Sequence, residues 1–192
     1  MTTHQADDAG TCVTLSGSLT RLREFRSSDG DDAFTIVGDD RVTRFLSFDS
    51  RTRDAAQTMI DGAVERAQVR PRTEYYLGMT RLDDDRLIGF CRLGLTGVKA
   101  AKLGYAVVAE QWGKGYATDA VRTALGFAFG PLDLHRVTAA IGPDNGASQT
   151  VVERLGFVRE GVLRDHVFTN NAWRDSVLYS VLATEWTEKV SK

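Results

Sequence analysis

The sequence predicts a domain of the α/β or α+β class with one mixed sheet. Three observations support this prediction: an amphipathic stretch over residues 52–69, a series of strand-like runs that follows it, and a second amphipathic stretch over residues 116–129 that begins soon after a strand-like run. Helical and strand periods alternate along the chain, and no repeat or Pro/Ser-rich linker separates them. This pattern is typical of a single domain in which helices pack on a sheet.

Each element is predicted from the spacing of its apolar residues or from the turn residues beside it. Alternating apolar residues indicate strands, as at Val137, Ala139 and Ile141, and apolar residues three or four positions apart indicate helices. Pro71 follows the first amphipathic helix, and Asp83–Asp85 form a turn between two strand-like runs. The predicted elements, in order, are a strand at 19–25, two short helices within 27–49, a helix at 52–69, a hairpin at 74–81 and 86–95, a strand at 101–108, a helix at 116–129, a strand at 136–141, a helix at 145–155, and a second hairpin at 157–168 and 175–183 with a turn at Asn170-Asn171.

Composition and charge argue against several classes of protein. The chain has 192 residues, enough for one packed domain, and we expect residues 13–192 to form it after a polar, mobile tail at 1–12. The net charge is -2 and the basic residues are scattered, so neither nucleic acid nor a membrane is an expected partner. The sequence contains no long apolar run and no recognisable signal peptide, so a cytoplasmic location is expected. Cys12 and Cys91 show no C-x-x-C spacing and the three histidines are far apart, so no metal site is expected.

Small residues at Gly113, Gly115 and Ala117 lie between a predicted strand and the helix at 116–129. Such a segment turns sharply and leaves several backbone N–H groups unpaired at the helix start, where the helix dipole favours negative charge. Lys114 adds a positive charge. The segment therefore predicts a phosphate-binding loop, and a plain glycine-rich turn is the alternative interpretation.

Two familiar phosphate-binding patterns do not fit this segment. A P-loop requires G-x-x-x-x-G-K-[ST], but Gly115 follows Lys114 and position 108 is valine. The dinucleotide fingerprint G-x-G-x-x-G requires glycine where Thr118 stands, and Asp133 precedes the next strand instead of ending it. A third pattern extends well beyond the glycines.

The third pattern is a series of ordered motifs over about eighty residues. It comprises G-Y at 104–105, W-G-K-G-Y-A-T at 112–118, L-H-R-V at 134–137, N-x-x-S-x-x-V-x-E-R-L-G-F at 145–157, E-G-V-L-R at 160–164, W-R-D at 173–175 and E-W at 185–186. In this region the chain resembles the RimJ/RimL branch of the GCN5-related N-acetyltransferase (GNAT) superfamily, whereas its first half resembles that branch only loosely. The resemblance implies a metal-free enzyme that transfers acetyl from acetyl-CoA to a primary amine, and a single domain with a mostly antiparallel sheet and helices on both faces.

The resemblance also implies where acetyl-CoA binds. The pantetheine arm would pair with the backbone at Val107 and Val108, and Asn145 would hydrogen-bond the arm. Trp112 stands where the superfamily usually has arginine or glutamine, so the grip on the pyrophosphate is expected to rest on backbone N–H groups. The residues expected around the pyrophosphate are Trp112, Gly113, Lys114, Gly115, Tyr116, Ala117 and Thr118.

Acetyl transfer needs a donor for the carbonyl oxygen and a partner for the departing thiolate. A backbone N–H near Val107 is the expected oxyanion donor. Ser148 lies on the same helical face as Asn145, and Val152 stands where many superfamily members have tyrosine. Ser148 is therefore expected to hydrogen-bond the sulfur, with a local bond at the helix start as the alternative.

A general base is harder to predict from the sequence. Glu110 and Asp175 are the candidate carboxylates, and a solvated or structural role is the alternative for each. An N-terminal α-amine is roughly 10% neutral at pH 7 and a lysine about 0.04%, so an α-amine needs much less help from a base. The residues expected around the acceptor are Phe45, Phe48, Tyr75, Asn171 and Trp173.

Three functions remain open at this stage. The first is acetylation of a protein N-terminal amine, such as that of a ribosomal protein. The second is acetylation of a small amine such as an antibiotic, a polyamine or an amino-acid derivative. A peptide would need an open groove, and a small amine a closed pocket with carboxylates. The third is a module that binds acyl-CoA without turnover. The oligomeric state, with a homodimer as one option, is left open.

Overall fold

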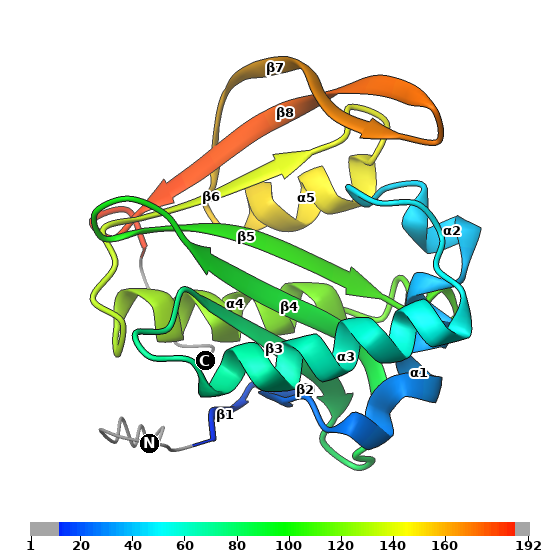
Figure 1. The fold of residues 1–192 in the computed structure, drawn as a ribbon. Coiled ribbons are helices and arrows are strands. Elements are labelled where there is room, and N and C mark those ends of the chain that lie inside the picture. Colours follow the sequence, from blue (N-terminus) through cyan, green and yellow to red (C-terminus); the bar gives the residue numbers. More distant parts are fainter. Residues whose placement is uncertain (1–11, 187–192) are drawn as a thin grey trace.

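A computed structural model describes residues 12–186 as one mixed α/β domain (Figure 1). The eight strands form one sheet in the order β1-β2-β3-β4-β5-β6-β8-β7, and every neighbouring pair is antiparallel except β5 and β6. The expected N-terminal tail lies outside the described residues apart from Cys12, which is exposed. The strands are β1 (Thr14–Ser16), β2 (Thr20–Glu24), β3 (Glu74–Arg81), β4 (Leu87–Leu95), β5 (Ala100–Val107), β6 (Arg136–Ile141), β7 (Val158–Thr169) and β8 (Ala172–Leu182).

Five α-helices cover the two faces of this sheet (Figure 1). One face packs against α1 and α3 through a cluster that includes Phe25, Tyr76 and Phe90, and the other packs against α4 and α5 around Met79 and Val137. Successive side chains of a strand point to opposite faces, and β3, β4 and β5 supply residues to both clusters. The helices are α1 (Gly30–Val37), α2 (Asp40–Thr43), α3 (Arg53–Gln68), α4 (Tyr116–Phe129) and α5 (Gly146–Arg154), with two short 3-10 turns at Ser27–Asp29 and Ala109–Gln111.

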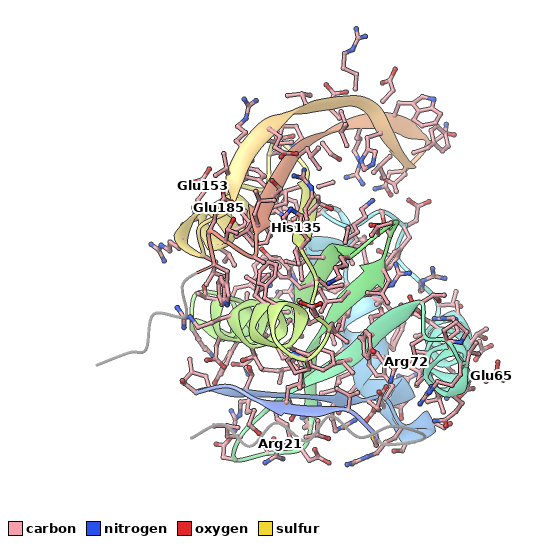
Figure 2. All side chains as sticks on the ribbon, turned by 90° about the vertical axis from the view of Figure 1, so that its left-hand side faces the viewer. Arg21, Glu65, Arg72, His135, Glu153 and Glu185 are labelled. Atoms are coloured by element: carbon pink, nitrogen blue, oxygen red, sulfur yellow. The ribbon has the colours of Figure 1, made fainter. Side chains whose placement is uncertain are left out.

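Charged side chains surround this apolar interior, as the end-on view of Figure 2 shows with Glu65 and Glu153. Both of these glutamates are exposed. Arg72 differs, because its side chain is only 8% exposed and donates to Glu24 at 2.7 Å. Among residues 12–186, no helix is long and apolar enough to cross a membrane.

The structure confirms the predicted class and the order of the elements from residue 19 onward. It adds β1, whose three residues pair with Arg21–Arg23 of β2 and are too few to show a period of their own. The second short helix is a single turn, Asp40–Thr43, and it ends before Phe48. The predicted turn at Asn170-Asn171 is present, and both residues have positive φ, as the tight turn of a two-residue hairpin requires.

The β7–β8 hairpin reaches across the sheet to the loop after α2 (Figure 1). Arg174 donates to the carbonyl oxygens of Arg44 and Leu46, and the backbone N–H of Asn170 donates to Asp49 Oδ1 at 2.7 Å. These contacts join segments that lie 121 to 130 positions apart in the sequence. The hairpin therefore fixes the position of residues 44–49.

Candidate active site

The strands β5 and β6 separate part-way along their length and leave a wedge in the sheet (Figure 1). They pair at only four positions, from Ala100↔Arg136 to Leu103↔Ala139. The N–H of Val108 donates to the carbonyl oxygen of Ile88 in β4, on the side of β5 that faces away from β6. Because hydrogen-bonding direction alternates along an antiparallel ladder, the backbone groups of Tyr105 and Val107 point away from β4 and into the wedge.

The glycine loop lies at the mouth of this wedge and presents a row of unpaired donors. The backbone N–H groups of residues 113–118 make no hydrogen bond to any residue that the structure describes, and Asp119 is the first whose N–H does, to Gly115. Gly113 and Gly115 have φ of +75° and +85°, a left-handed conformation that a side chain would strain. Consecutive free N–H groups at a helix start suit a phosphate group.

Asp119 links the glycine loop to residues 18–20 at the start of β2. Its buried carboxylate accepts hydrogen bonds from the N–H groups of Ser18, Leu19 and Thr20 at 2.9–3.0 Å, and from the Thr20 hydroxyl at 2.8 Å. The carboxylate thus turns toward β2, and the donors of the loop remain free. Sequence reasoning missed this residue, which directly follows the recognised motif.

The side chain of Trp112 contacts the end of β5, the strand that borders the wedge. Its indole N–H donates to the Val107 carbonyl oxygen at 2.7 Å. Val108 uses both of its backbone groups, since its N–H donates to Ile88 and its carbonyl oxygen accepts from Gln111. Val108 thus has no unpaired backbone group for the expected pantetheine arm, whereas the N–H of Val107 points into the wedge, and pairing of the arm at Val107 stays a prediction. Lys114, expected to contact phosphate, donates to Gln111 Oε1 at 2.8 Å.

Asn145 and Ser148 begin α5 beside the wedge. Asn145 caps the helix by accepting from the Ser148 N–H at 3.1 Å. The Ser148 hydroxyl makes no hydrogen bond to residues 12–186, whereas the nearby Thr150 hydroxyl donates locally to Gly146 at 2.9 Å. A local helix-start bond is thus seen at Thr150 and not at Ser148.

Tyr105 is a further residue of this site that sequence reasoning did not assign a role. Its hydroxyl donates to the Ser148 carbonyl oxygen at 3.2 Å and so joins β5 to the first turn of α5. Burial raises the pKa of Tyr105 to about 12, so it stays protonated. Tyr105 alternates with Leu103 and Val107 along β5, and both of these pack in the core under α4 and α5. This alternation was the sequence signal that Tyr105 faces α5.

Each of the two predicted bases already has a hydrogen-bond partner within the protein. Glu110 pairs with Arg41 at 2.5 Å, and this hydrogen bond lowers the pKa of its carboxyl, which weakens it as a base near neutral pH. Asp175 is exposed and accepts from the backbone N–H of Asp165 at 2.9 Å, where β7 bulges against β8. Neither carboxylate is among the residues that line the cavity described next.

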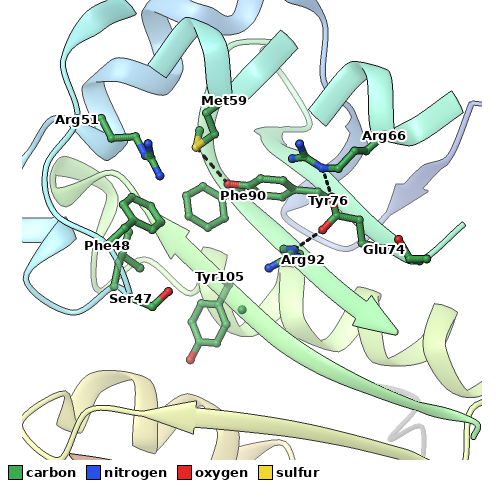
Figure 3. Close-up of a pocket in the computed structure, with 13 residues that line it drawn as sticks. Ser47, Phe48, Arg51, Met59, Arg66, Glu74, Tyr76, Phe90, Arg92 and Tyr105 are labelled. Carbon is green, nitrogen blue, oxygen red and sulfur yellow. Dashed lines mark hydrogen bonds and ion pairs between the residues drawn. The ribbon is translucent and has the colours of Figure 1, made fainter. Parts of the chain in front are cut away.

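A cavity of about 440 Å³ opens on the opposite face of the sheet from α4, between α3, the loop after α2 and strands β3 to β5 (Figure 3). Gly104 of β5 lies in its wall, and a Cβ there would meet open space. Gly104 and Tyr105 of β5, the strand that borders the wedge, are thus part of the cavity wall. Its lining residues are Leu46, Ser47, Phe48, Arg51, Met59, Arg66, Thr73, Glu74, Tyr76, Phe90, Arg92, Gly104 and Tyr105.

Of the five residues expected around the acceptor, only Phe48 lines this cavity. Tyr75 faces the other side of the sheet and packs edge-on against Phe127, because side-chain direction alternates along β3. Trp173 packs on Phe168 at the exposed hairpin, close to Asn171. Phe45 is stacked by the Arg44 guanidinium.

The cavity is rich in positive charge. Glu74 is buried and accepts from Arg66 Nε and Arg92 Nε, each at 2.5 Å (Figure 3). Burial opposes ionisation of Glu74, but the two arginine hydrogen bonds outweigh it, so the pKa of its carboxyl lies below the usual value. Arg51 also lines the cavity and stacks over Phe48 at 4.7 Å.

Other titratable groups lie outside this site. His166 Nδ1 and the Ser176 hydroxyl are 2.9 Å apart, and partial burial lowers the pKa of His166, which leaves the imidazole mostly neutral at pH 7. His166 does not line the cavity. Burial raises the pKa of the Cys91 thiol to about 12, which makes it unreactive. Over the described range, no three His, Cys, Asp or Glu side chains gather closely enough to hold a metal ion.

A family model described as an acetyltransferase (GNAT) domain matches residues 20–158, which span the glycine loop, the wedge and the cavity. The chain belongs to the GNAT acetyltransferase family. The match begins in β2, so it includes the first half of the chain, where the sequence motifs were weakest. This GNAT domain is accordingly an N-acetyltransferase of the type that the motifs at 104–186 indicated.

The GNAT chain is similar to named N-acetyltransferases and to solved structures of the same fold. It is 28% identical over 164 residues to the uncharacterized N-acetyltransferase YoaA of Bacillus subtilis, covering 84% of this chain and 92% of that protein. It is 30% identical over 116 residues to the ribosomal protein uS5-alanine N-acetyltransferase of Escherichia coli, covering 59% of this chain and 60% of the relative. The structure of Mycobacterium smegmatis RimJ in complex with CoA-disulfide superposes with a TM-score of 0.77 at 24% identity, covering 91% of this chain and 88% of that one.

Proposed function

We propose that the protein transfers acetyl from acetyl-CoA to the N-terminal α-amine of a protein, of the kind that ribosomal proteins present. One observation carries the choice of acceptor: the only carboxylate among the residues that line the cavity, Glu74, is already held by two arginines. The proposal also rests on the family and on the uS5-specific relative. A ribosomal acceptor would place the reaction in the cytoplasm.

The free donors of the wedge support acetyl-CoA as the co-substrate. The N–H groups of residues 113–118 fit a pyrophosphate, and the N–H of Val107 fits the pantetheine arm or the thioester carbonyl. A RimJ structure in the same fold was solved with a CoA disulfide. The acetyl group would then lie where the wedge meets Gly104, between cofactor and cavity.

The charge of the cavity supports an α-amine over a polyamine or an aminoglycoside-like antibiotic. A polycationic acceptor needs free carboxylates, and the guanidinium groups of Arg51, Arg66 and Arg92 would repel it. The absence of a free base among the lining residues matters little for an α-amine, because roughly 10% of it is already neutral at pH 7.

The reaction then needs few groups from the protein. The amine nitrogen attacks the thioester carbonyl carbon, and the new N–C bond replaces the C–S bond. The N–H of Val107 donates to the carbonyl oxygen as that atom gains negative charge. The Ser148 hydroxyl donates to the departing sulfur, and water takes the proton that the amine loses.

The test measures thiol release from acetyl-CoA with peptides of varied N-terminal residue and with a panel of small amines. We expect peptides to be the better acceptors and Ser148→Ala to lower kcat about 10- to 100-fold, because a hydrogen bond to a charged leaving group is lost. Thr150→Ala is the matched control, since its hydroxyl bonds locally two positions away. Faster turnover of polyamines than of any peptide would refute the acceptor class. Failure to bind acetyl-CoA would refute the site.

A further inference from the structure

Arg51 is a charged group of the cavity that the acetyl-transfer site does not use. Its Nε atom is buried and makes no hydrogen bond, and its guanidinium has no carboxylate partner among residues 12–186. Figure 3 shows its side chain turned into the cavity from the loop before α3, opposite Tyr76 and Arg92. A buried donor without a partner is costly in a folded protein, so a group that satisfies it is stabilised there.

The surroundings of Arg51 fit an anion. Arg66 and Arg92 each commit only Nε to Glu74, so their remaining N–H groups are free to bind a second acceptor. Arg51, Arg66 and Arg92 line the same cavity, next to the buried Tyr76. Three guanidinium groups against one carboxylate leave the cavity with excess positive charge.

Apolar side chains line the cavity beside the three arginines. Phe48, Met59 and Phe90 line the cavity next to the arginines. Arg51 stacks over Phe48, and this contact holds the guanidinium plane in place. A planar, preorganised guanidinium suits a carboxylate, which it binds with two parallel hydrogen bonds.

We propose that the acceptor carries a carboxylate close to its amine, and that Arg51 selects it. The acceptor is thus a protein N-terminus with aspartate or glutamate at its second or third residue. This inference rests on the proposed function for the position of the amine. Arg51 acts on specificity: it binds the acceptor and takes no part in bond making or breaking.

The experiment compares amidated hexapeptides that have alanine first and differ only by Asp against Asn, or Glu against Gln, at the second or third residue. Amidation removes the C-terminal carboxylate as a competing anion. Two readouts are taken: thiol release from acetyl-CoA, and calorimetric binding of each peptide to the CoA-saturated enzyme. We expect the acidic peptides to have about a tenfold lower KM and Kd, with kcat unchanged, and this preference to decrease as salt is added.

Variants of two arginines separate recognition from stability. Arg51→Gln should abolish the preference, and Arg51→Lys should keep part of it because the charge remains. Arg53→Gln is the matched control, since Arg53 also stacks on a phenylalanine, Phe34, but pairs with Asp31 outside the cavity. It should leave the preference intact.

Equal Kd values for acidic and amide peptides in the unmodified enzyme would overturn the inference while leaving N-terminal acetylation standing. A preference that survives in Arg51→Gln would also overturn it. If no peptide is acetylated, the proposed function fails, and the binding comparison alone then decides whether the cavity selects a carboxylate.

Discussion

The two sides of the sheet differ in the groups that they present for binding: backbone N–H groups on one side and side chains on the other. On the α4–α5 side, the donors expected to hold acetyl-CoA are backbone N–H groups of one continuous stretch, residues 113–118. On the α3 side, the cavity is made by side chains from a loop, a helix and three strands. A binding site made of backbone groups depends on local conformation, so it can be predicted from a run of consecutive residues. A side-chain site depends on the packing of distant elements, and its specificity is free to change while the fold stays the same.

The largest expected effect concerns the support of the backbone site. Asp119→Asn should lower the free energy of unfolding by about 2–4 kcal/mol, because four donors lose a charged acceptor that is itself buried. Urea denaturation measures this change. Asp133→Asn is the control, since Asp133 is an exposed partner of Lys99 and should change stability by less than about 0.5 kcal/mol. Equal losses in the two variants would show that the loop does not depend on this side chain.

The second prediction concerns the side-chain site. Glu74→Gln should lower the free energy of unfolding by about 1–3 kcal/mol at pH 7, because two hydrogen bonds from Arg66 and Arg92 lose their charged acceptor. Since the folded pKa of Glu74 lies below its ordinary value of 4.5, its contribution is complete above pH 4.5 and is lost as pH falls through the lowered pKa.

Denaturant unfolding of both proteins at pH 7 and at pH 3 checks this sign. The difference between Glu74→Gln and the unmodified protein should shrink on acidification. Glu65→Gln, at an exposed position of α3, serves as the control with a change below about 0.5 kcal/mol. A difference that grows toward low pH would contradict the assignment of Glu74 as an ionised, clamped carboxylate.

The third prediction tests how far the backbone conformation controls cofactor binding. Gly115→Ala places a Cβ at φ +85°, which costs about 1–2 kcal/mol and should weaken acetyl-CoA binding roughly tenfold in calorimetry. Gly126→Ala makes the same change in the interior of α4, where nothing lies within 4 Å of the new atom. That control should stabilise the protein by about 0.5–1 kcal/mol and leave binding unchanged. Equal affinities of the two variants would argue against the loop as the phosphate site.

The smallest expected effect is on the link between the two sides. Tyr105→Phe removes the hydrogen bond to the Ser148 carbonyl oxygen, worth about 0.5–1.5 kcal/mol, and should lower kcat a few-fold with little change in the KM for acetyl-CoA. Steady-state kinetics separates the two constants. Tyr75→Phe, on the same face of the sheet and packed against Phe127, is the control and should leave both constants unchanged. A rise in KM alone would mean that Tyr105 does not position α5.

The sequence predicted these regions to different degrees, for the same physical reason. Gly113 and Gly115 were readable because they belong to one local strand–loop–helix unit, and Ser148 because it lies in the first turn of α5, three positions after the cap Asn145. The residues that line the cavity were largely not predicted, because a shift of one position along β3 separates Tyr75, which faces α4, from Tyr76, which lines the cavity. Arg51 and Glu74 carried no motif. The ion pairs of Glu74 with Arg66 and Arg92 depend on how α3 and β4 pack beside it.

The hairpin that holds residues 44–49 has a consequence for when the protein becomes active. The chain leaves the ribosome N-terminus first, so the glycine loop and α4 emerge before Asn170 and Arg174. Leu46 and Phe48 line the cavity, and their loop is fixed only once the hairpin has closed over it. A nascent chain that has reached α5 therefore lacks the contacts that hold this part of the cavity wall. Assembly of the last two strands completes the cavity after the glycine loop has been made.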